Sequence, residues 1–171
     1  AAALAGDLDA ALVFAGQALE RPDEPTRALA ATISAAALAH RGMAAESAAL
    51  YQWPAPSTSA VPPLVGLGRL AEARRVVDAP AADHPTVGSA VRDLMARGVL
   101  DSVTGSPVFA LSELLRAAAL LAPPGRTALL PDTPAALAAL VAVNLGELDI
   151  ATAVLSGVTT SPAERRRHLL L

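Results

Sequence analysis

Apolar residues recur at helical spacing along most of the chain, and short breaks containing glycine or proline separate the helical stretches. The segment 133–157 shows the pattern most fully, because Thr133 and Pro134 together are typical of a helix start. One stripe of this expected helix is apolar apart from a single asparagine: Leu137, Leu140, Val141, Asn144 and Leu145. Gly146 then predicts a tight turn into a second helix, so the segment is a helical hairpin that cannot bury its apolar stripe alone.

The same signature recurs elsewhere as a glycine, four residues, and then a small residue at the start of the next helix. The expected turn glycines are Gly6, Gly42, Gly68 and Gly146, and the small residues that follow are Ala11, Ser47, Ala73 and Ala151. A small side chain lets two antiparallel helices approach closely, because the distance between helix axes depends on the residues at their contact. Repeated helix pairs of roughly 34 to 40 residues are typical of stacked α-solenoids.

The pattern predicts other helices of varied length between these hairpins. They are expected at about 25–40, 43–51, 61–67, 84–97 and 107–122, with Leu29, Ile33, Ala36 and His40 on one face of the first. Gly98 is expected to end the fourth of these helices, and residues 99–105 to form an irregular connection. The stretches 54–59 and 123–132 are expected loops. A capping box predicts a last helix from Ser161 that is cut off at Leu171, so we expect the chain to be an excised part of a longer protein.

Composition restricts the fold to the all-α class. Alanine makes up about a quarter of the 171 residues and has the highest helix propensity, whereas aromatic residues make up only 2%. No apolar run reaches the 18 or so residues that a membrane span needs. We therefore predict one helical array over residues 1–171, an α-solenoid of about five hairpins with the first and last incomplete.

Charge and cysteine content exclude several classes of function. The chain has no cysteine, so disulfides and thiolate metal sites are excluded. Its net charge of −3 gives no general attraction to nucleic acid or to an anionic membrane, so neither is an expected partner. No secretory signal pattern opens the chain, and a cytoplasmic location is expected. No cofactor is expected.

Three segments carry a resemblance to a known repeat family. Residues 6–12, 67–74 and 145–151, which read GDLDAAL, LGRLAEAR and LGELDIA, resemble the turn and second-helix start of tetratricopeptide repeats. In that comparison Ala11, Ala73 and Ala151 occupy the small packing position of the second helix, and Ala18 occupies a later one. The aromatic positions of the repeat consensus are mostly missing, so these are degenerate copies.

Arrays of this alanine-, leucine- and arginine-rich kind resemble the sensor region of MalT-like bacterial transcriptional regulators of the LuxR type. In that family a tetratricopeptide-like solenoid lies between an ATPase module and a helix-turn-helix, receives an inducer that is often a small saccharide, and supports oligomerisation. The resemblance implies a small-molecule inducer, self-association, and ATPase and DNA-binding modules elsewhere in the same longer chain. No GxxxxGK motif and no basic recognition helix is present here, so ATP and DNA binding are expected outside this segment.

Two polar residues are candidates for an inducer site on the concave face. His40 and Asn144 each precede a turn glycine by two residues, and Arg41 follows His40 directly. The end of the first helix of each tetratricopeptide pair contributes to the groove, so these residues are expected to bind a hydroxyl-rich ligand such as a disaccharide. The alternative is that His40 and Asn144 are two buried polar groups, each satisfied separately.

Tyr51 and Trp53 supply half of the aromatic residues and lie together before a proline-rich loop. Such rings stack on the C–H face of a sugar or anchor a protein interface. The alternative is a cap that seals the end of a helix pair.

No constellation of residues predicts an enzyme. The three histidines, His40, His84 and His168, have no metal-ligand spacing, and the carboxylates are spread over turns and exposed faces. The run at 165–167 is either a solvated helix face or a contact for phosphate or an acidic partner. Glu72 with Arg75 and Glu113 with Arg116 are expected surface ion pairs. The alternative functions are a scaffold that binds a peptide or protein in its groove, and a spacer without a ligand.

Overall fold

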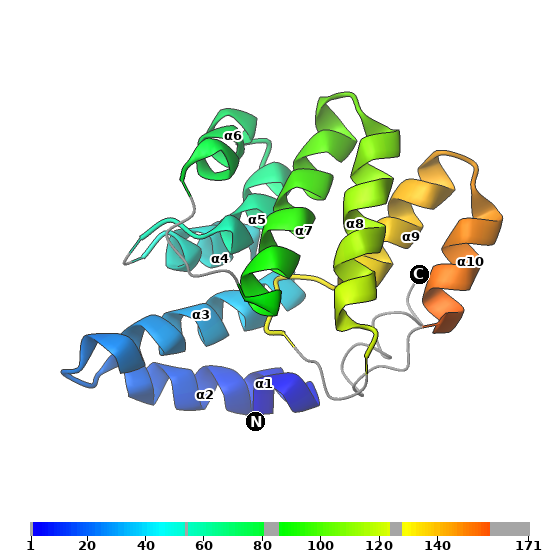
Figure 1. The fold of residues 1–171 in the computed structure, drawn as a ribbon. Helices are drawn as coiled ribbons and strands as arrows, with labels where there is room; N and C mark the ends of the chain where they lie inside the picture. The colour runs from blue at the N-terminus through cyan, green and yellow to red at the C-terminus, as the bar shows by residue number, and fades with distance from the viewer. Residues whose placement is uncertain (1, 54, 81–85, 124–127, 158–171) are drawn as a thin grey trace.

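The computed structural model describes residues 2–53, 55–80, 86–123 and 128–157, and all regular structure in these ranges is helical (Figure 1). The elements are α1 (Ala2–Ala5), α2 (Leu8–Leu19), α3 (Glu24–His40), α4 (Ala44–Tyr51), the 3₁₀ turn η1 (Thr58–Ala60), α5 (Val61–Gly66), α6 (Leu70–Asp78), α7 (Val87–Thr104), α8 (Pro107–Leu121), α9 (Pro134–Asn144) and α10 (Leu148–Gly157). The all-α class predicted from composition is confirmed.

Several helices begin where short polar side chains cap their first turn. Asp7 and Asp23 accept hydrogen bonds of 3.0 Å from backbone N–H groups three residues later. Thr133 does the same for Ala136 at 3.1 Å, with Pro134 in the first helical position, as predicted. These caps satisfy N–H groups that have no partner inside the helix, and so they fix the helix starts.

Five glycines are the residues with positive φ in the described ranges, and four of them are the predicted turn glycines. The φ angles of these four lie between 72° and 81°, a left-handed conformation that glycine adopts without steric cost. At the end of α3, Gly42 N–H bonds to Ala39 and Met43 N–H bonds to Leu38, both at 2.9 Å, which reverses the chain directly into α4. The hairpin turns read from the sequence are confirmed.

The small residue five positions after each turn glycine is buried, as predicted. Ala11, Ser47, Ala73 and Ala151 are each at most 4% exposed. Ser47 also donates a hydrogen bond of 2.8 Å from its hydroxyl to the Ala35 carbonyl, which joins α4 to α3. The contact positions of these hairpins are therefore filled by side chains small enough for close helix approach.

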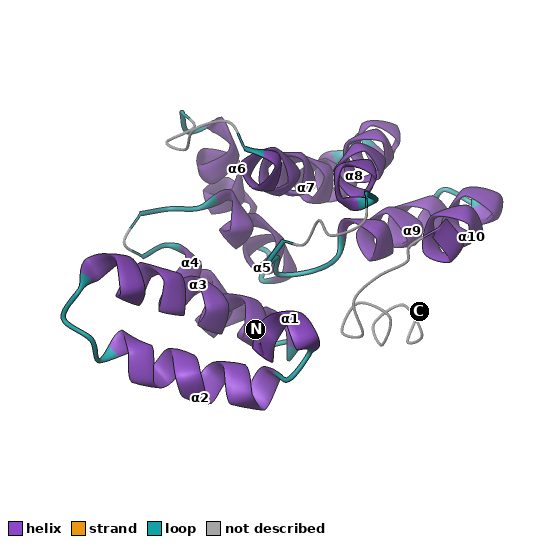
Figure 2. Ribbon diagram, turned by 60° about the horizontal axis from the view of Figure 1, so that its bottom comes forward, coloured by secondary structure: helices purple, strands orange, loops and turns teal. Residues whose placement is uncertain are grey.

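Most of the packing joins helices that are neighbours in the chain, and Figures 1 and 2 show these pairs side by side. Most of the larger buried side chains belong to two clusters, one spanning α7 to α10 and one spanning α3 to α7. Helix α7 contributes Met95 and Val99 to the first cluster, and Ala96 and Leu100 to the second. Helix α7 therefore lies between the two clusters and contributes buried side chains to both.

The prediction that Gly98 ends a helix is wrong. Helix α7 continues through it to Thr104, and Gly105, with φ of 117°, ends the helix instead. A Cβ atom at Gly98 would lie 2.7 Å from Leu114 Cγ and 3.1 Å from the Ala110 carbonyl oxygen. Gly98 therefore lies at a close contact of α7 with α8. Residues 99–104 are helical and do not form an irregular connection.

The apolar stripes predicted for α3 and α9 differ from their buried faces. Leu29 is 61% exposed and Leu140 is 44% exposed, whereas the alanines of both helices are largely buried. Close-packed helices place their smallest residues at the contact, so here the leucines remain at the margins. The two helices also show that a leucine stripe is a poor guide to the core of an alanine-rich chain.

One connection that was expected to be a simple loop enters the core. Leu130 is buried in the α7–α10 cluster, and Leu129 packs against the α3–α7 cluster. The segment 128–132, yellow in Figure 1, therefore runs between the two cores before α9 begins.

Four features considered in the sequence lie outside the described residues: the helix predicted from Ser161, the arginine run at 165–167, His84 and His168. No helix among the described residues has both the length and the apolar character to cross a membrane.

Candidate functional site

His40, at the end of α3, is hydrogen-bonded to the loop that precedes α9. Its Nε2 atom lies 3.1 Å from the Leu130 carbonyl oxygen. A carbonyl only accepts, so Nε2 carries the proton in this contact. The ring predicted to face a ligand is therefore engaged by the protein's own backbone.

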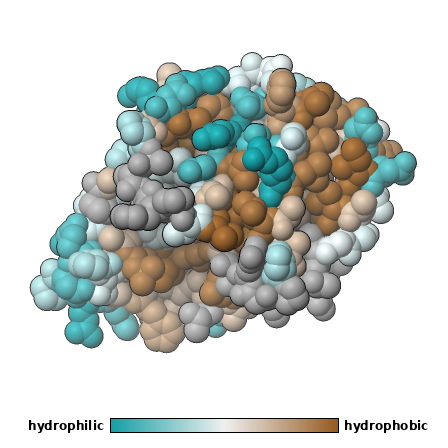
Figure 3. Space-filling view, viewed as in Figure 1, coloured by the Kyte–Doolittle hydropathy of each residue, from teal (hydrophilic) through white to brown (hydrophobic). Residues whose placement is uncertain are grey.

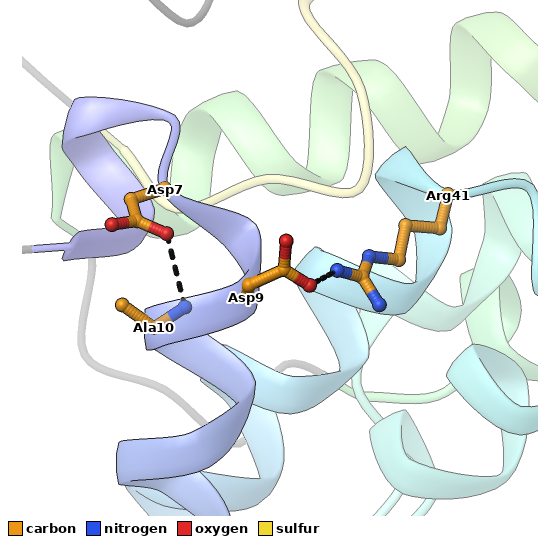
Figure 4. A network of polar contacts seen from close by, with 4 residues as sticks. All are labelled: Asp7, Asp9, Ala10 and Arg41. Carbon is orange, nitrogen blue, oxygen red and sulfur yellow. Dashed lines mark hydrogen bonds and ion pairs between the residues drawn. The ribbon is translucent and has the colours of Figure 1, made fainter.

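Arg41 joins the end of α3 to the start of α2, at the open end of the α2–α3 hairpin. Its guanidinium forms an ion pair with Asp9 in the first turn of α2, and the neighbouring Asp7 caps the same helix through Ala10 N–H (Figure 4). The Asp9 side chain is 88% exposed. An ion pair this open to solvent contributes about 0–1 kcal/mol, so Arg41 has a local structural role here.

Tyr51 is a core residue in this fold. It is 3% exposed and packs with Val61, Leu64 and Leu100 in the α3–α7 cluster. Its hydroxyl has no hydrogen-bond partner in the described part of the chain. Burial raises the pKa of Tyr51, and the positive charge of Arg92 opposes this only in part. The ring is closed to a sugar approaching from solvent.

Trp53 lies at the surface, where the Arg27 guanidinium lies over its ring. Its side chain is 36% exposed, and the Arg27 guanidinium carbon lies 5.0 Å from the centre of its ring. This distance is within the range of a cation–π interaction. Tyr51 and Trp53 are close in sequence but do not form a joint platform, because only one of them is open to solvent.

Asn144 lies far from His40. It is the exposed last residue of α9, whereas His40 contacts the chain just before the first residue of that helix. A helix of 11 residues is about 16 Å long, so the two side chains lie at opposite ends of α9. The structure does not bring the five predicted site residues together.

A cleft that the sequence did not predict lies between α6, α7 and the loop before η1. It has a volume of about 560 Å³. Three stretches of chain form its wall: residues 55–58, Val76 to Pro80 at the end of α6, and Thr86 to Arg97 on α7. We call it the α6–α7 cleft. Figure 3 shows hydrophilic side chains over α6 and the adjacent part of α7, and a more hydrophobic surface over α8 and α9.

Both charged residues of the α6–α7 cleft and one of its serines lie on one face of α7. Ser89, Asp93 and Arg97 follow one another at steps of four residues, and all three line the cleft. Thr58, the first residue of η1 on the facing side, donates a hydrogen bond of 2.9 Å to Asp93 Oδ1. Ser89 takes part in the capping box of α7 with Thr86, with bonds of 2.9 and 3.0 Å. The four-residue spacing was the signal in the sequence that could have indicated this site.

A smaller groove lies between α1, α2 and α3 and is almost wholly apolar. Its volume is about 180 Å³, and Phe14, Leu29 and Ile33 form part of its wall. Phe14 is 63% exposed. The groove offers contact area but no charged group.

Two surface ion pairs were predicted from the sequence at Glu72 and Glu113. Glu72 accepts two hydrogen bonds from Arg69, at 2.7 and 2.6 Å, so its expected pairing with Arg75 is wrong. This bond to Arg69 lowers the pKa of Glu72. The pair of Glu113 with Arg116, at 3.2 Å, is confirmed. Within the described ranges, no group of three or more histidine or acidic side chains could hold a metal ion.

Comparisons of the chain with protein-family models, with curated proteins and with solved structures gave no match. The arrangement of the described helices, the α6–α7 cleft and the apolar groove between α1, α2 and α3 are the features that bear on function.

Proposed function

We propose that this chain is the ligand-sensing segment of a longer, MalT-like transcriptional regulator and that its hairpins form a tetratricopeptide-like α-solenoid. Four glycine turns, each followed by a buried small residue, support the repeat character of the array. Packing mainly between chain neighbours supports it as well, because each unit of a solenoid contacts the next. This is a binding role without catalysis, and self-association and the ATPase and DNA-binding modules of the longer chain are part of the same proposal.

The α6–α7 cleft is the observation on which this proposal rests. Its volume of about 560 Å³ falls within the roughly 300–1,000 Å³ of small-molecule sites. Its walls come from residues 55–58, from α6 of the α5–α6 hairpin, and from α7, which starts the next hairpin, so an occupant contacts two successive units. A ligand that binds one packing of these units more tightly shifts the population toward it, which is how a sensor would signal to attached modules.

A cleft-filling variant tests the proposal. Ala90 lines the cleft, so Ala90→Phe would occupy it, whereas Ala71→Phe places the same ring on the exposed side of α6 as a matched control. Calorimetric titration would use a panel of disaccharides and of free amino acids. We expect at least one compound to bind the wild type and Ala71→Phe and to lose binding in Ala90→Phe.

Two further variants locate the site of any binding. His40→Ala and Asn144→Ala test the groove predicted from the sequence. If they abolish binding and Ala90→Phe does not, the ligand sits on that groove and the α6–α7 cleft is the wrong site. Absence of binding by every member of the panel contradicts the sensor proposal.

A protein- or peptide-binding scaffold is the second candidate, and the apolar groove between α1 and α3 favours it. Phe14 and Leu29 expose more than half of their side chains there. An amphipathic helical peptide would be the probe, followed by fluorescence anisotropy. For a scaffold we expect Phe14→Gln and Leu29→Gln to abolish peptide binding and Ala90→Phe to leave it unchanged.

A further inference from the structure

The α6–α7 cleft contains two opposite charges that do not pair with each other. Asp93 and Arg97 are one helical turn apart on α7, a spacing that brings Cβ atoms within about 5–6 Å and favours a direct ion pair. Among the described residues neither takes part in an ion pair. Asp93 instead accepts a hydrogen bond from Thr58, across the cleft, at 2.9 Å. One Asp93 oxygen thus accepts from Thr58 of η1, and the Arg97 donors are left for another acceptor.

The rest of the wall is mainly apolar and gives the cleft a second kind of surface. The apolar residues come from the loop before η1, from α6 with the two residues after it, and from α7, and the larger ones are Pro56, Val76, Val77 and Pro80. Ser57 and Ser89 add hydroxyl groups beside them. The cleft therefore offers an anion, a cation and an apolar surface within one volume.

We propose that the α6–α7 cleft binds a small zwitterion, namely a free amino acid or a dipeptide with an apolar side chain. The ligand's carboxylate binds the Arg97 guanidinium, whose fork of N–H donors matches the two oxygens of a carboxylate. Its ammonium group donates to Asp93, which as a carboxylate only accepts. Its side chain lies on the valine and proline surface. This inference rests on the proposed sensing function and names a different ligand class from the saccharide that the family resemblance implies.

Three forms of one amino acid separate the two charge contacts. Leucine has both charges, N-acetyl-leucine has only the carboxylate, and leucinamide has only the ammonium group. The variants are Arg97→Met and Asp93→Asn, with Arg74→Met on the exposed side of α6 as the control. Asparagine keeps an acceptor for Thr58, and Arg97 is exposed, so both variants are expected to fold, which thermal unfolding would check.

For the wild type and for Arg74→Met, calorimetry should show that leucine binds more tightly than N-acetyl-leucine or leucinamide. We expect Arg97→Met to weaken leucine and N-acetyl-leucine by about tenfold or more and to leave leucinamide unchanged, because an ionic hydrogen bond contributes at least this much. Asp93→Asn should weaken leucine and leucinamide and leave N-acetyl-leucine unchanged. The same pattern is expected for leucyl-leucine.

Two results overturn the zwitterion proposal. One is equal binding of leucine by wild type and Arg97→Met. The other is binding of disaccharides, sensitive to Ala90→Phe, with no binding of leucine, phenylalanine or leucyl-leucine; the sensing function then stands and the ligand class is wrong. If neither class binds, both proposals fail.

Discussion

At the scale of single residues, glycine stabilises the fold at a turn with positive φ and destabilises it within a helix. Gly42 has φ of 78°, where any side chain is strained, whereas Gly16 lies on the exposed side of α2 with open space around it. We expect Gly42→Ala to lower the free energy of unfolding by about 1–2 kcal/mol. Gly16→Ala should raise it by about 0.5–1 kcal/mol, because alanine favours the helix. Urea unfolding of both variants measures this, and equal effects of the same sign would contradict it.

The buried hydroxyl of Tyr51 is a second residue-scale feature with a measurable consequence. It has no hydrogen-bond partner among the described residues, so the fold carries the cost of removing it from water. Tyr51→Phe keeps the ring and removes this cost, and we expect it to raise the free energy of unfolding by about 1 kcal/mol. Tyr51→Ala, which also empties the core, is the contrasting variant and should lower it by about 3–5 kcal/mol. Destabilisation by Tyr51→Phe would show that the hydroxyl has an energetic partner.

Asp132 makes stability depend on pH. Burial raises its pKa from 3.8 to about 6, and the hydrogen bond of 2.7 Å from Thr133 N–H only partly opposes this. The native state therefore binds the proton more tightly than the unfolded chain does. The stabilisation of the native state by the proton on Asp132 is complete below about pH 4 and is lost as the pH rises to about 6.

Asp132→Asn should remove this dependence, because an amide keeps an acceptor for Thr133 and carries no charge. At neutral pH we expect the variant to be more stable than the wild type by about 1–3 kcal/mol, since each unit of pKa corresponds to about 1.4 kcal/mol. The difference should vanish near pH 4. Urea unfolding of both proteins across this pH range measures it, and a constant difference would contradict the assignment to Asp132.

At the scale of elements, Gly98 shows why the same residue type cannot be interpreted from sequence alone. The pattern around it resembles a helix end, but its lack of a side chain serves the contact of α7 with α8. We expect Gly98→Ala to lower the free energy of unfolding by about 1–3 kcal/mol, because the new methyl group meets Leu114 Cγ at 2.7 Å.

A double variant separates this clash from helix propensity. Leu114→Ala alone should cost about 2–5 kcal/mol, because it empties a fully buried position. In Gly98→Ala/Leu114→Ala the added methyl group enters the emptied space, so the combined loss should be smaller than the sum of the two. Additive losses would show that the two positions do not interact.

Most element boundaries could be predicted because their signals are local. A turn glycine, a capping residue and a proline act within a few residues of their own position, as Gly146, Thr133 and Pro134 show. The buried face of a helix depends on what packs against it, and this is why Leu140 and Leu29 were misassigned. The path of residues 128–132 between two cores depends on both cores at once and has no local signal.

The candidate site could be predicted only in part for the same reason. Ser89, Asp93 and Arg97 lie on one face of a helix, and that spacing is visible in the sequence. Thr58, which bonds to Asp93 from 35 residues away, belongs to η1, whose position depends on the helices that pack against it, α4 to α7. The sequence pattern predicts that His40 lies on the apolar face of its helix, but its partner is a backbone carbonyl 90 residues later, which no pattern of side chains indicates.

At the scale of the whole molecule, two cores share one helix. Leu114 belongs to the α7–α10 cluster and Leu64 to the α3–α7 cluster, while α7 contributes to both. In the solenoid that we propose, stability would be approximately a sum of unit and neighbour terms, so we expect the two cores to open separately. A single compact core would instead open as one cooperative unit.

Native-state hydrogen exchange distinguishes these cases. We expect amides of α7 to exchange most slowly, because α7 is buried between both cores. Leu114→Ala should speed exchange in α8, α9 and α10 and leave α3 and α4 nearly unchanged, whereas Leu64→Ala, equally buried, should do the reverse. Equal acceleration of all helices by either variant would mean one cooperative core, and a ligand in the α6–α7 cleft could then not shift one unit relative to the next.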